Sequence, residues 1–247
     1  MNDTTNSGRV AVITGASSGI GAATARALVA DGYRLALLAR RADRIEALAQ
    51  ELGNGSLAIA ADVTDRDSIV AAAQRVQDEL GGAHVLVNNA GVMLLGPFDT
   101  EQRDDYRQMI EVNLLGAITA TEVFLDQLKT GAADRGGDII NISSVAGRTA
   151  RAGNGVYAAT KWGLNGWSES LRQELLPTIR VTLIEPGVVA TELPDHITHP
   201  ETREGVQQLY SGAEVTAEDV ADIIAFTLSR PRRLAINEVL LRPAGQL

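Results

Sequence analysis

The chain has 247 residues, of which 22 are Lys or Arg and 31 are Asp or Glu, so its formal net charge is −9, and it contains no cysteine. A chain of this length suits one large α/β unit or two small ones, and it can bury a core without covalent staples. The absence of cysteine excludes disulfides, a thiol nucleophile and cysteine-ligated metals, and the acidic balance argues against nucleic acid or an anionic membrane as the main partner.

The amino-terminal segment lacks the basic and apolar parts of a signal peptide, and no apolar run approaches the roughly 20 residues of a membrane-spanning helix. We therefore expect a soluble cytoplasmic protein. Short runs rich in β-branched residues and leucine, the expected strands, alternate with longer segments of helical period, the expected helices. The expected strands are 10–14, 35–39, 57–60, 85–88, 138–142, 181–185 and 236–241. The expected helices are 20–31, 43–52, 66–80, 103–129, 156–176 and 216–229.

Most of the expected strands are apolar throughout, which is typical of strands covered on both faces. The alternation of strand and helix predicts an α/β fold with a Rossmann-type, doubly wound sheet of seven parallel strands and helices on both faces. No linker or change of composition marks a boundary, so we expect a single dinucleotide-binding and catalytic domain over 1–247. The polar segment 190–212 is long for a connection in such a domain, which favours a substrate lid over an ordinary surface loop.

A glycine-rich turn, TGASSGIG, follows the first expected strand and leads into the first expected helix. In such a turn Gly15 permits the tight bend, Gly19 lets a pyrophosphate approach the backbone, and Gly21 lets helix and strand pack closely. The helix N-terminus offers free N–H groups to the phosphates. The spacing predicts the phosphate end of a dinucleotide site, with a purely structural turn as the alternative.

The second expected strand ends at Ala39 and is followed by Arg40 and Arg41. Sites that prefer NAD commonly carry an acidic residue here for the ribose 2′-hydroxyl, whereas guanidinium groups match the 2′-phosphate of NADP. The sequence therefore predicts NADP(H) as the cofactor. The alternative is that both arginines are solvated loop residues.

Polar and small residues also follow the later strands. Asp62 could accept a hydrogen bond from an adenine amino group while Val63 packs on the ring, or Asp62 could cap a helix. Asn88 in the motif NNAG is as suited to bracing neighbouring strands as to touching a ligand. The turn EPGVVAT would bring backbone groups and the Thr191 hydroxyl to the place of a nicotinamide carboxamide.

The motif YxxxK places Tyr157 and Lys161 on one face of an expected helix. A nearby ammonium favours the phenolate, so we expect it to lower the pKa of Tyr157 from its usual value of about 10 and to make the phenol an acid–base group. Ser144 would polarise a substrate carbonyl oxygen, with Ser143 as the alternative. Asn113, polar in an apolar helical stretch, is either a satisfied core amide or the anchor of a water bound to Lys161.

The remaining candidates concern metals and the substrate. His84, His196 and His199 lack the arrangement of a metal site, so we expect no metal. We expect an apolar substrate pocket with some polar groups, lined by Met93, Leu94, Val145, Ala146, Asn154 and the segment 190–212.

Taken in chain order, TGASSGIG, ARR, ADV, NNAG, Asn113, Ser144, YxxxK and PGVVAT resemble the short-chain dehydrogenase/reductase family over about 10–241. The resemblance implies that Asn113, Ser144, Tyr157 and Lys161 form a catalytic tetrad. The cofactor contacts that we infer from it and from the turns are Gly15, Ser17, Ser18, Ile20, Arg40, Arg41, Asp62, Val63, Asn89, Ala90, Gly91, Tyr157, Lys161, Pro186, Gly187, Val189 and Thr191. Other NADP-binding members place a basic residue where this chain has Ser18, so the 2′-phosphate would depend on Arg40 and Arg41.

Within the family, MLLGP at 93–97, TEL at 191–193 and LRP at 241–243 resemble the clavulanate dehydrogenases and the 3-hydroxy-acid dehydrogenases. The resemblance implies an NADP(H)-dependent reduction of an aldehyde or ketone, or the reverse. It also implies a homotetramer or a dimer that uses the helices at 103–129 and 156–176. The alternatives are a catalytically silent NADP-binding sensor or scaffold, and an epimerase or dehydratase acting on nucleotide sugars.

Overall fold

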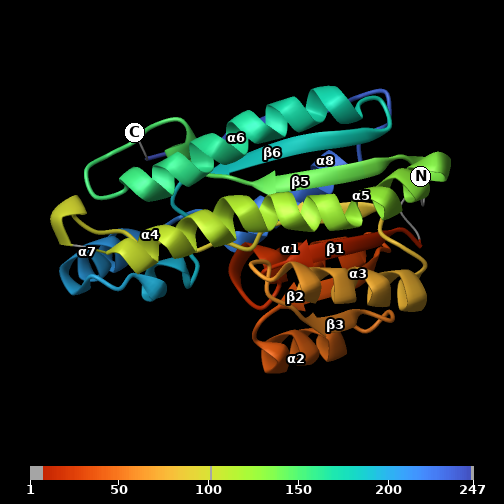
Figure 1. Cartoon of the computed structure of the whole chain (residues 1–247), viewed down its shortest axis with the longest axis horizontal. Coiled ribbons are helices and arrows are strands. Elements are labelled where there is room, and N and C mark those ends of the chain that lie inside the picture. The colour runs from red at the N-terminus through yellow and green to blue at the C-terminus, as the bar shows by residue number, and fades with distance from the viewer. Residues whose placement is uncertain (1–7, 101, 246–247) are drawn as a thin grey trace.

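A computed structural model describes residues 8–100 and 102–245 of the chain. Seven strands form one parallel sheet in the order β3-β2-β1-β4-β5-β6-β7, which confirms the predicted doubly wound α/β fold (Figure 1). The strands are β1 (Val10–Thr14), β2 (Arg34–Ala39), β3 (Leu57–Ala60), β4 (Val85–Asn88), β5 (Gly137–Ile142), β6 (Ile179–Pro186) and β7 (Glu238–Leu241). The helices are α1 (Gly19–Ala30), α2 (Ala42–Leu52), α3 (Arg66–Leu80), α4 (Arg103–Ile110), α5 (Gly116–Arg135), α6 (Gly155–Leu175), α7 (Pro200–Ser211) and α8 (Ala217–Leu228). Within the described ranges, no helix combines the length and the apolar character needed to cross a membrane.

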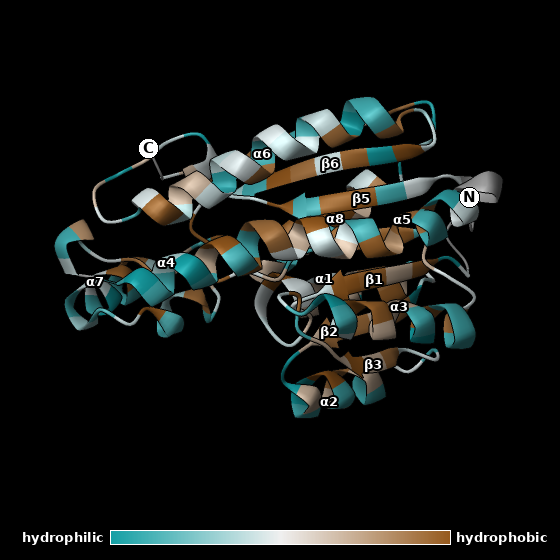
Figure 2. Cartoon of the chain, viewed as in Figure 1, coloured by the Kyte–Doolittle hydropathy of each residue, from teal (hydrophilic) through white to brown (hydrophobic). Residues whose placement is uncertain are grey.

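Alternate residues of the central strands pack against helices on opposite faces of the sheet. Val10 and Val12 of β1 belong to one hydrophobic cluster with residues of α3, α5 and α6, whereas Ala11 and Ile13 belong to a second cluster with residues of α1, α2 and α8. In Figure 1, α5 and α6 cross the near side of the sheet and α8 lies behind it. Figure 2 shows the strands mainly in the brown of hydrophobic residues, while α3, α4 and α7 carry teal hydrophilic patches. The apolar strand sequences thus follow from helices covering both faces.

The strand order reverses at β1, and this reversal positions the candidate site. β1 pairs with β2 on one side and with β4 on the other, and the remaining strands extend outward from these two neighbours. The connections that leave β1 and β4 therefore diverge above the carboxyl ends of the strands. In sheets of this kind, ligands bind in the crevice that this divergence opens.

The helix predicted over 103–129 is interrupted. α4 ends at Ile110, a π-helical turn covers Glu111–Leu115, and α5 continues from Gly116. A π turn inserts one extra residue into the helix and changes the direction of the side chains around it. The turn carries Asn113, which is only 2% exposed and contacts the segment after β4.

The segment 190–212 contains more regular structure than its polar composition indicated. It holds a short 3-10 turn, Leu193–His196, and the helix α7. Pro200 stands at the start of α7, and the side chain of His199 accepts a hydrogen bond from the Thr202 N–H. Both features favour a helix start at this point.

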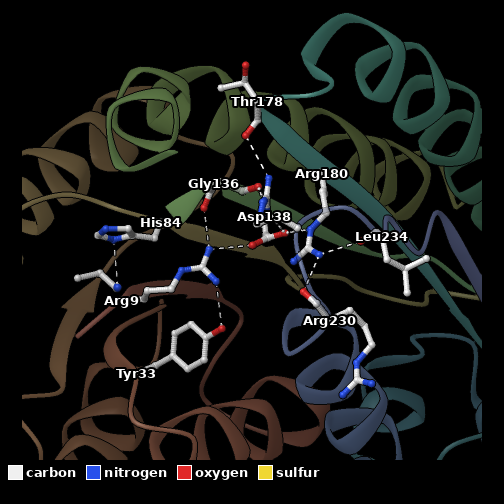
Figure 3. Close-up of polar contacts among 12 residues, drawn as sticks. Arg9, Tyr33, His84, Gly136, Asp138, Thr178, Arg180, Arg230 and Leu234 are labelled. Atoms are coloured by element: carbon white, nitrogen blue, oxygen red, sulfur yellow. Dashed lines mark hydrogen bonds and ion pairs between the residues drawn. The ribbon is translucent and has the colours of Figure 1, made fainter. Parts of the chain in front are cut away.

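The amino end of the sheet encloses a buried carboxylate among three arginines (Figure 3). Asp138 of β5 accepts hydrogen bonds from Arg9 Nη2 at 2.8 Å, Arg180 Nε at 2.6 Å and Arg232 Nη1 at 3.0 Å. Asp138, Arg9 and Arg180 are buried. Arg180 also donates to the backbone carbonyls of Arg230 and Leu234, and Arg9 to that of Gly136. We call Arg9, Asp138, Arg180 and Arg232 the amino-end charge cluster. The cluster connects the start of β1 to β5, β6 and the segment before β7, at the end of the sheet opposite the crevice.

Candidate active site

A cavity of about 720 Å³ lies along the carboxyl ends of the strands, across the point where the strand order reverses. All the cofactor-binding residues that the sequence predicted lie on its wall, namely Gly15, Ser17, Ser18, Ile20, Arg40, Arg41, Asp62, Val63, Asn89, Ala90, Gly91, Tyr157, Lys161, Pro186, Gly187, Val189 and Thr191. Of the predicted catalytic residues, Ser144, Tyr157 and Lys161 line the cavity and Asn113 does not. One cavity therefore joins the two groups of residues.

The glycine-rich turn is interlocked with the turn after β4. Gly15 has a φ of +65°, which favours glycine, and a Cβ at this position would lie 2.8 Å from the Cα of Ala90. A Cβ at Gly21 would lie 2.5 Å from the Gly15 carbonyl oxygen. The Thr14 hydroxyl accepts hydrogen bonds from the N–H groups of Asn89 and Ala90 at 3.0 and 3.1 Å. The two turns therefore form a single rigid floor for the cavity.

Two adjacent asparagines at the end of β4 serve mainly to brace the structure. Asn88 donates to Thr121 Oγ1 at 2.9 Å and to Asn141 Oδ1 at 2.8 Å, so it links β4 to α5 and β5. Asn89 donates to the backbone carbonyls of Thr14 and Gly15. Of the two roles considered for Asn88, bracing is the one that its hydrogen bonds fulfil.

At the end of the cavity next to β2, Arg41 is fixed against the glycine-rich turn. Its Nε and Nη2 atoms donate to Ser17 Oγ at 3.1 and 2.9 Å, and Nη2 also donates to Ser18 Oγ at 2.7 Å. A guanidinium group thus lies at Ser18, the position where the sequence lacks a basic residue. Arg40 is exposed and, within 8–100 and 102–245, makes no ion pair.

Asp62 and Val63 lie on the same part of the wall, after β3. Asp62 Oδ1 accepts hydrogen bonds from the Thr64 N–H at 3.0 Å and the Thr64 hydroxyl at 2.8 Å. The residue that caps α3 is Asp65, whose side chain accepts from the Asp67 N–H. The alternative of Asp62 as the helix cap is therefore wrong, and its carboxylate shapes the turn that precedes the cap.

At the other end of the cavity, Tyr157 and Lys161 stand one turn apart on α6, 7% and 5% exposed. Lys161 Nζ lies 5.7 Å from the centre of the Tyr157 ring and donates to the Ile142 carbonyl oxygen at 2.9 Å. Ser144, just after β5, shares a hydrogen bond with Tyr157. Ser143 points elsewhere, because its hydroxyl donates to Asn165 Oδ1 at 2.6 Å. The geometry thus selects Ser144 over Ser143 as the partner of the phenol.

The direction of the Tyr157 pKa shift differs from the expectation. Burial raises the pKa of Tyr157 to about 12, and the hydrogen bond from Ser144 opposes this rise only in part. Burial also lowers the pKa of Lys161 to about 8. The expected lowering of the Tyr157 pKa is therefore wrong, because the loss of solvation on burial dominates. The phenol is protonated at neutral pH, which suits a proton donor.

Asn113 lies in the π turn, and its side-chain amide is satisfied by the chain. Its Oδ1 accepts from the Val92 N–H at 2.8 Å, and its Nδ2 donates to the Val92 carbonyl at 2.9 Å and to Thr160 Oγ1 at 3.3 Å. A Cβ at Gly91 would lie 3.4 Å from Asn113 Oδ1 and 4.0 Å from Lys161 Nζ. Asn113 thus matches the core-amide alternative and holds the backbone beside Lys161.

The substrate end of the cavity includes residues that the sequence did not single out. Tyr210 of α7 reaches Met93, with its hydroxyl 3.8 Å from the methionine sulfur, and burial followed by the proximity of Tyr157 raises its pKa. Further residues of segment 190–212 line the cavity, namely Leu193, His196, Val206 and Leu209. Val206, Leu209 and Tyr210 have helical spacing, which was the available signal. Leu94, expected in the pocket, is instead 3% exposed within the core.

The three histidines lie in different parts of the structure. His84 Nδ1 accepts from the Val10 N–H, His199 caps α7 and His196 lies on the cavity wall. Over the described parts of the chain, no group of three His, Asp or Glu side chains is placed to hold a metal ion.

Comparison with known proteins gives consistent matches over nearly the whole chain. Residues 9–202 match the family described as short chain dehydrogenase. Serine 3-dehydrogenase of Agrobacterium fabrum is 37% identical over 238 residues, which cover 95% of this chain and 94% of that protein. An uncharacterised oxidoreductase of Staphylococcus saprophyticus is 36% identical over 242 residues, which cover 96% of this chain and 97% of that protein.

Solved structures agree. A closed form of serine dehydrogenase complexed with NADP+ is 31% identical, with a TM-score of 0.89 and 96% of each chain covered. A metagenomic short-chain oxidoreductase in complex with NADP is 37% identical, with a TM-score of 0.80, and the match covers 97% of this chain and 99% of that one.

Proposed function

The chain belongs to the short-chain dehydrogenase/reductase family, and from this premise we propose that it is an NADP(H)-dependent oxidoreductase that reduces an aldehyde or ketone to an alcohol, or catalyses the reverse. One observation carries the proposal. Ser144, Tyr157 and Lys161 share a cavity wall with Arg40 and Arg41, so groups suited to a carbonyl and groups suited to a phosphate face the same space. The NADP in two similar structures supports the choice of cofactor.

The residues on the wall fit a dinucleotide. The floor made by Gly15 and Gly21 leaves no space for a side chain, as a backbone surface for a pyrophosphate requires. Arg40 and Arg41 would hold the 2′-phosphate, and the further contacts would come from Ser17, Ser18, Ile20, Asp62, Val63, Asn89, Ala90, Gly91, Pro186, Gly187, Val189 and Thr191. When bound, the nicotinamide would supply the hydride for the carbonyl carbon.

The side chains at the other end would manage the oxygen and its proton. The Ser144 hydroxyl orients and polarises the carbonyl oxygen. The Tyr157 phenol, protonated at neutral pH, donates its proton to that oxygen as it becomes a hydroxyl. The Lys161 ammonium stabilises the phenolate that remains, and Asn113 positions the backbone at Val92 beside it. A phenol with a raised pKa favours reduction near neutral pH, and oxidation of the alcohol should need a higher pH.

Substitution of the phenol tests the mechanism. Tyr157→Phe should lower kcat for carbonyl reduction by roughly 10²- to 10⁴-fold, because it removes the proton donor and little else. Turnover is followed by NADPH absorbance with a panel of aldehydes and ketones, and NADPH affinity, measured by fluorescence titration, should stay within about threefold of wild type. Near-normal turnover in this variant would remove Tyr157 from the mechanism. Absence of turnover by the wild type on the whole panel would favour a catalytically silent NADP-binding protein.

The arginines after β2 test the cofactor. Arg40→Ala and Arg41→Ala should each raise KM for NADPH far more than KM for NADH, roughly tenfold or more, because a charge-assisted pair with the 2′-phosphate is lost. Arg41→Ala should have the larger effect, since Ser17 and Ser18 already hold that guanidinium at the cavity wall. Equal effects on the two cofactors would exclude the arginine concerned from the phosphate site.

We also propose that the protein is a homotetramer or a dimer assembled through α4, α5 and α6. Large apolar side chains stand exposed on α4, on the π turn between α4 and α5 and on α6, with Ile110 at 43%, Leu115 at 49% and Trp162 at 54%. Exposed apolar groups of this size are typical of interfaces. Light scattering on the purified protein measures the assembly, and a monomer would contradict the proposal.

A further inference from the structure

A carboxylate from a distant segment lies between two arginines at the adenosine end of the cavity. Glu192, two residues after the bridge that joins Ala190 to Thr216, accepts from Arg44 Nη1 with both oxygens, at 3.1 and 2.9 Å. Its Oε2 also accepts from Arg41 Nη1 at 3.3 Å. The hydrogen bond from Arg44, and then that from Arg41, lowers the pKa of Glu192, so the group is an anion at neutral pH.

This contact joins the start of the segment 190–212 to the residues at the start of α2. Glu192 and Arg41 both lie on the cavity wall, and Arg41 is also bonded to Ser17 and Ser18. Thr191, the preceding residue, packs over the glycine-rich turn, where its Cγ2 lies 3.2 Å from the place of a Cβ at Gly19. The start of the segment 190–212 therefore lies across the glycine-rich turn, and the ion pair of Glu192 with Arg44 connects it to α2.

The charges around this point favour an exchange of anions. Arg40, Arg41 and Arg44 carry three positive charges and Glu192 one negative charge, so the group has an excess of two. A ribose 2′-phosphate carries about −1.5 to −2 charges at neutral pH and would seek the guanidinium N–H groups that Glu192 now holds. Two anions that share one guanidinium repel each other, so the stronger ligand displaces the weaker.

We propose that Glu192 determines cofactor specificity by acting as an internal anion, which occupies Arg41 and Arg44 until the 2′-phosphate of NADP(H) displaces it and frees the start of the segment 190–212. This inference rests on the proposed NADP(H) function. The strength of the ion pair suits exchange. The side chains of Glu192, Arg41 and Arg44 are 46%, 37% and 43% exposed, and pairs this exposed are weak enough to break on binding. NADH has no phosphate and would leave the contact in place.

The test uses ligands that contain only the adenosine end of the cofactor. Isothermal titration of the full chain measures Kd for adenosine 2′,5′-bisphosphate, which has the 2′-phosphate, and for adenosine 5′-monophosphate, which lacks it. Glu192→Gln keeps the shape of the side chain and removes its charge. Glu204→Gln is the matched control, because Glu204 is an exposed residue of α7 that has no ion pair within the described ranges.

We expect Glu192→Gln to tighten binding of the 2′,5′-bisphosphate about threefold to tenfold and to change binding of the monophosphate by less than twofold. The gain should shrink in 0.5 M salt, because screening weakens partly exposed charges. Glu204→Gln should change neither constant. Unchanged or weaker binding of the bisphosphate by Glu192→Gln would overturn the inference, since Glu192 would then be neutral or helpful to phosphate binding.

Hydrogen exchange gives a second, independent measurement. In the wild type, the bisphosphate should speed amide exchange over 190–196 relative to the monophosphate, because it releases Glu192. In Glu192→Gln, exchange should already be fast and insensitive to the choice of ligand. Slower exchange with the bisphosphate in the wild type would contradict displacement. The proposed cofactor preference fails separately, if the wild type binds the bisphosphate no better than the monophosphate.

Discussion

The two ends of the parallel sheet both hold buried ionisable groups, and Asp138 at one end and Lys161 at the other have opposite surroundings. At the amino end, the carboxylate of Asp138 is enclosed by three guanidinium groups, so its loss of solvation is offset by opposite charges. At the carboxyl end, Lys161 donates to the carbonyl of Ile142, and burial lowers its pKa to about 8. The first arrangement is typical of a structural tie and the second of a site whose groups are held ready for a reaction.

This difference has a consequence for stability. A buried ionisable group without an opposite charge lowers the free energy of unfolding. A buried ion pair does not have this cost as long as both of its partners are present. The two ends of the sheet should therefore respond with opposite signs when their central ionisable group is removed. Three substitutions test this contrast.

The largest effect is expected at the amino end. Asp138→Ala should lower the free energy of unfolding by about 3–5 kcal/mol, because it leaves buried guanidinium groups without their counterion. Urea unfolding at pH 7 measures this, and turnover per folded molecule should not change, because the cluster lies away from the cavity. Asp126→Ala, at an exposed position of α5, is the control and should stay within about 0.5 kcal/mol of the wild type. A loss below 1 kcal/mol in Asp138→Ala would break the contrast.

An intermediate effect of opposite sign is expected at the carboxyl end. Lys161→Met should abolish turnover and raise the free energy of unfolding at pH 7 by roughly 1–3 kcal/mol, because it removes a buried ammonium. The pKa of Lys161 is about 8 in the folded protein and 10.5 in the reference state, so between these values the unfolded chain binds more protons. The wild type should therefore gain stability as the pH rises from 8 to 10.5, and the advantage of the variant should shrink over that window. A constant difference from pH 7 to pH 10 would contradict this account.

The smallest effect is expected at the rim of the amino-end charge cluster. Arg232 is 33% exposed in its side chain, and burial together with repulsion from Arg180 and Arg9 lowers its pKa in spite of the attraction to Asp138. Arg232→Ala should therefore lower the free energy of unfolding by less than about 1 kcal/mol, because water can donate the hydrogen bonds that its N–H groups no longer supply. Urea unfolding checks this, and a loss as large as that of Asp138→Ala would show that Arg232 belongs to the buried part of the cluster.

The sequence sufficed for the features that depend on local pattern. Apolar runs and helical periods predicted the seven strands and their parallel direction, and the residue types of the glycine-rich turn and of YxxxK predicted which segments line the cavity. Each of these signals lies within a few neighbouring residues. The fold class follows from them because parallel strands need covering helices.

What the sequence did not predict depends on contacts between distant segments. Nothing near Glu192 indicates that it meets Arg41 and Arg44, and although the segment 190–212 was expected to line the pocket, nothing in it indicated that Tyr210 would reach Met93. The pKa of Tyr157 shifted against the expectation because burial, which the motif does not encode, raises it. The amide of Asn113 hydrogen-bonds the backbone of Val92 because Asn113 lies in a π turn, and the local sequence did not predict this turn.

The interlocked glycines bear on how this protein can be altered. A Cβ at Gly21 would lie 2.5 Å from the carbonyl oxygen of Gly15, so the glycine-rich turn does not accept a side chain at this position. Arg41, Arg44 and Glu192 belong to two other segments, outside the glycine-rich turn. Under the proposed roles, the choice between NADPH and NADH can therefore be altered by varying these three positions while the glycine-rich turn is left unchanged.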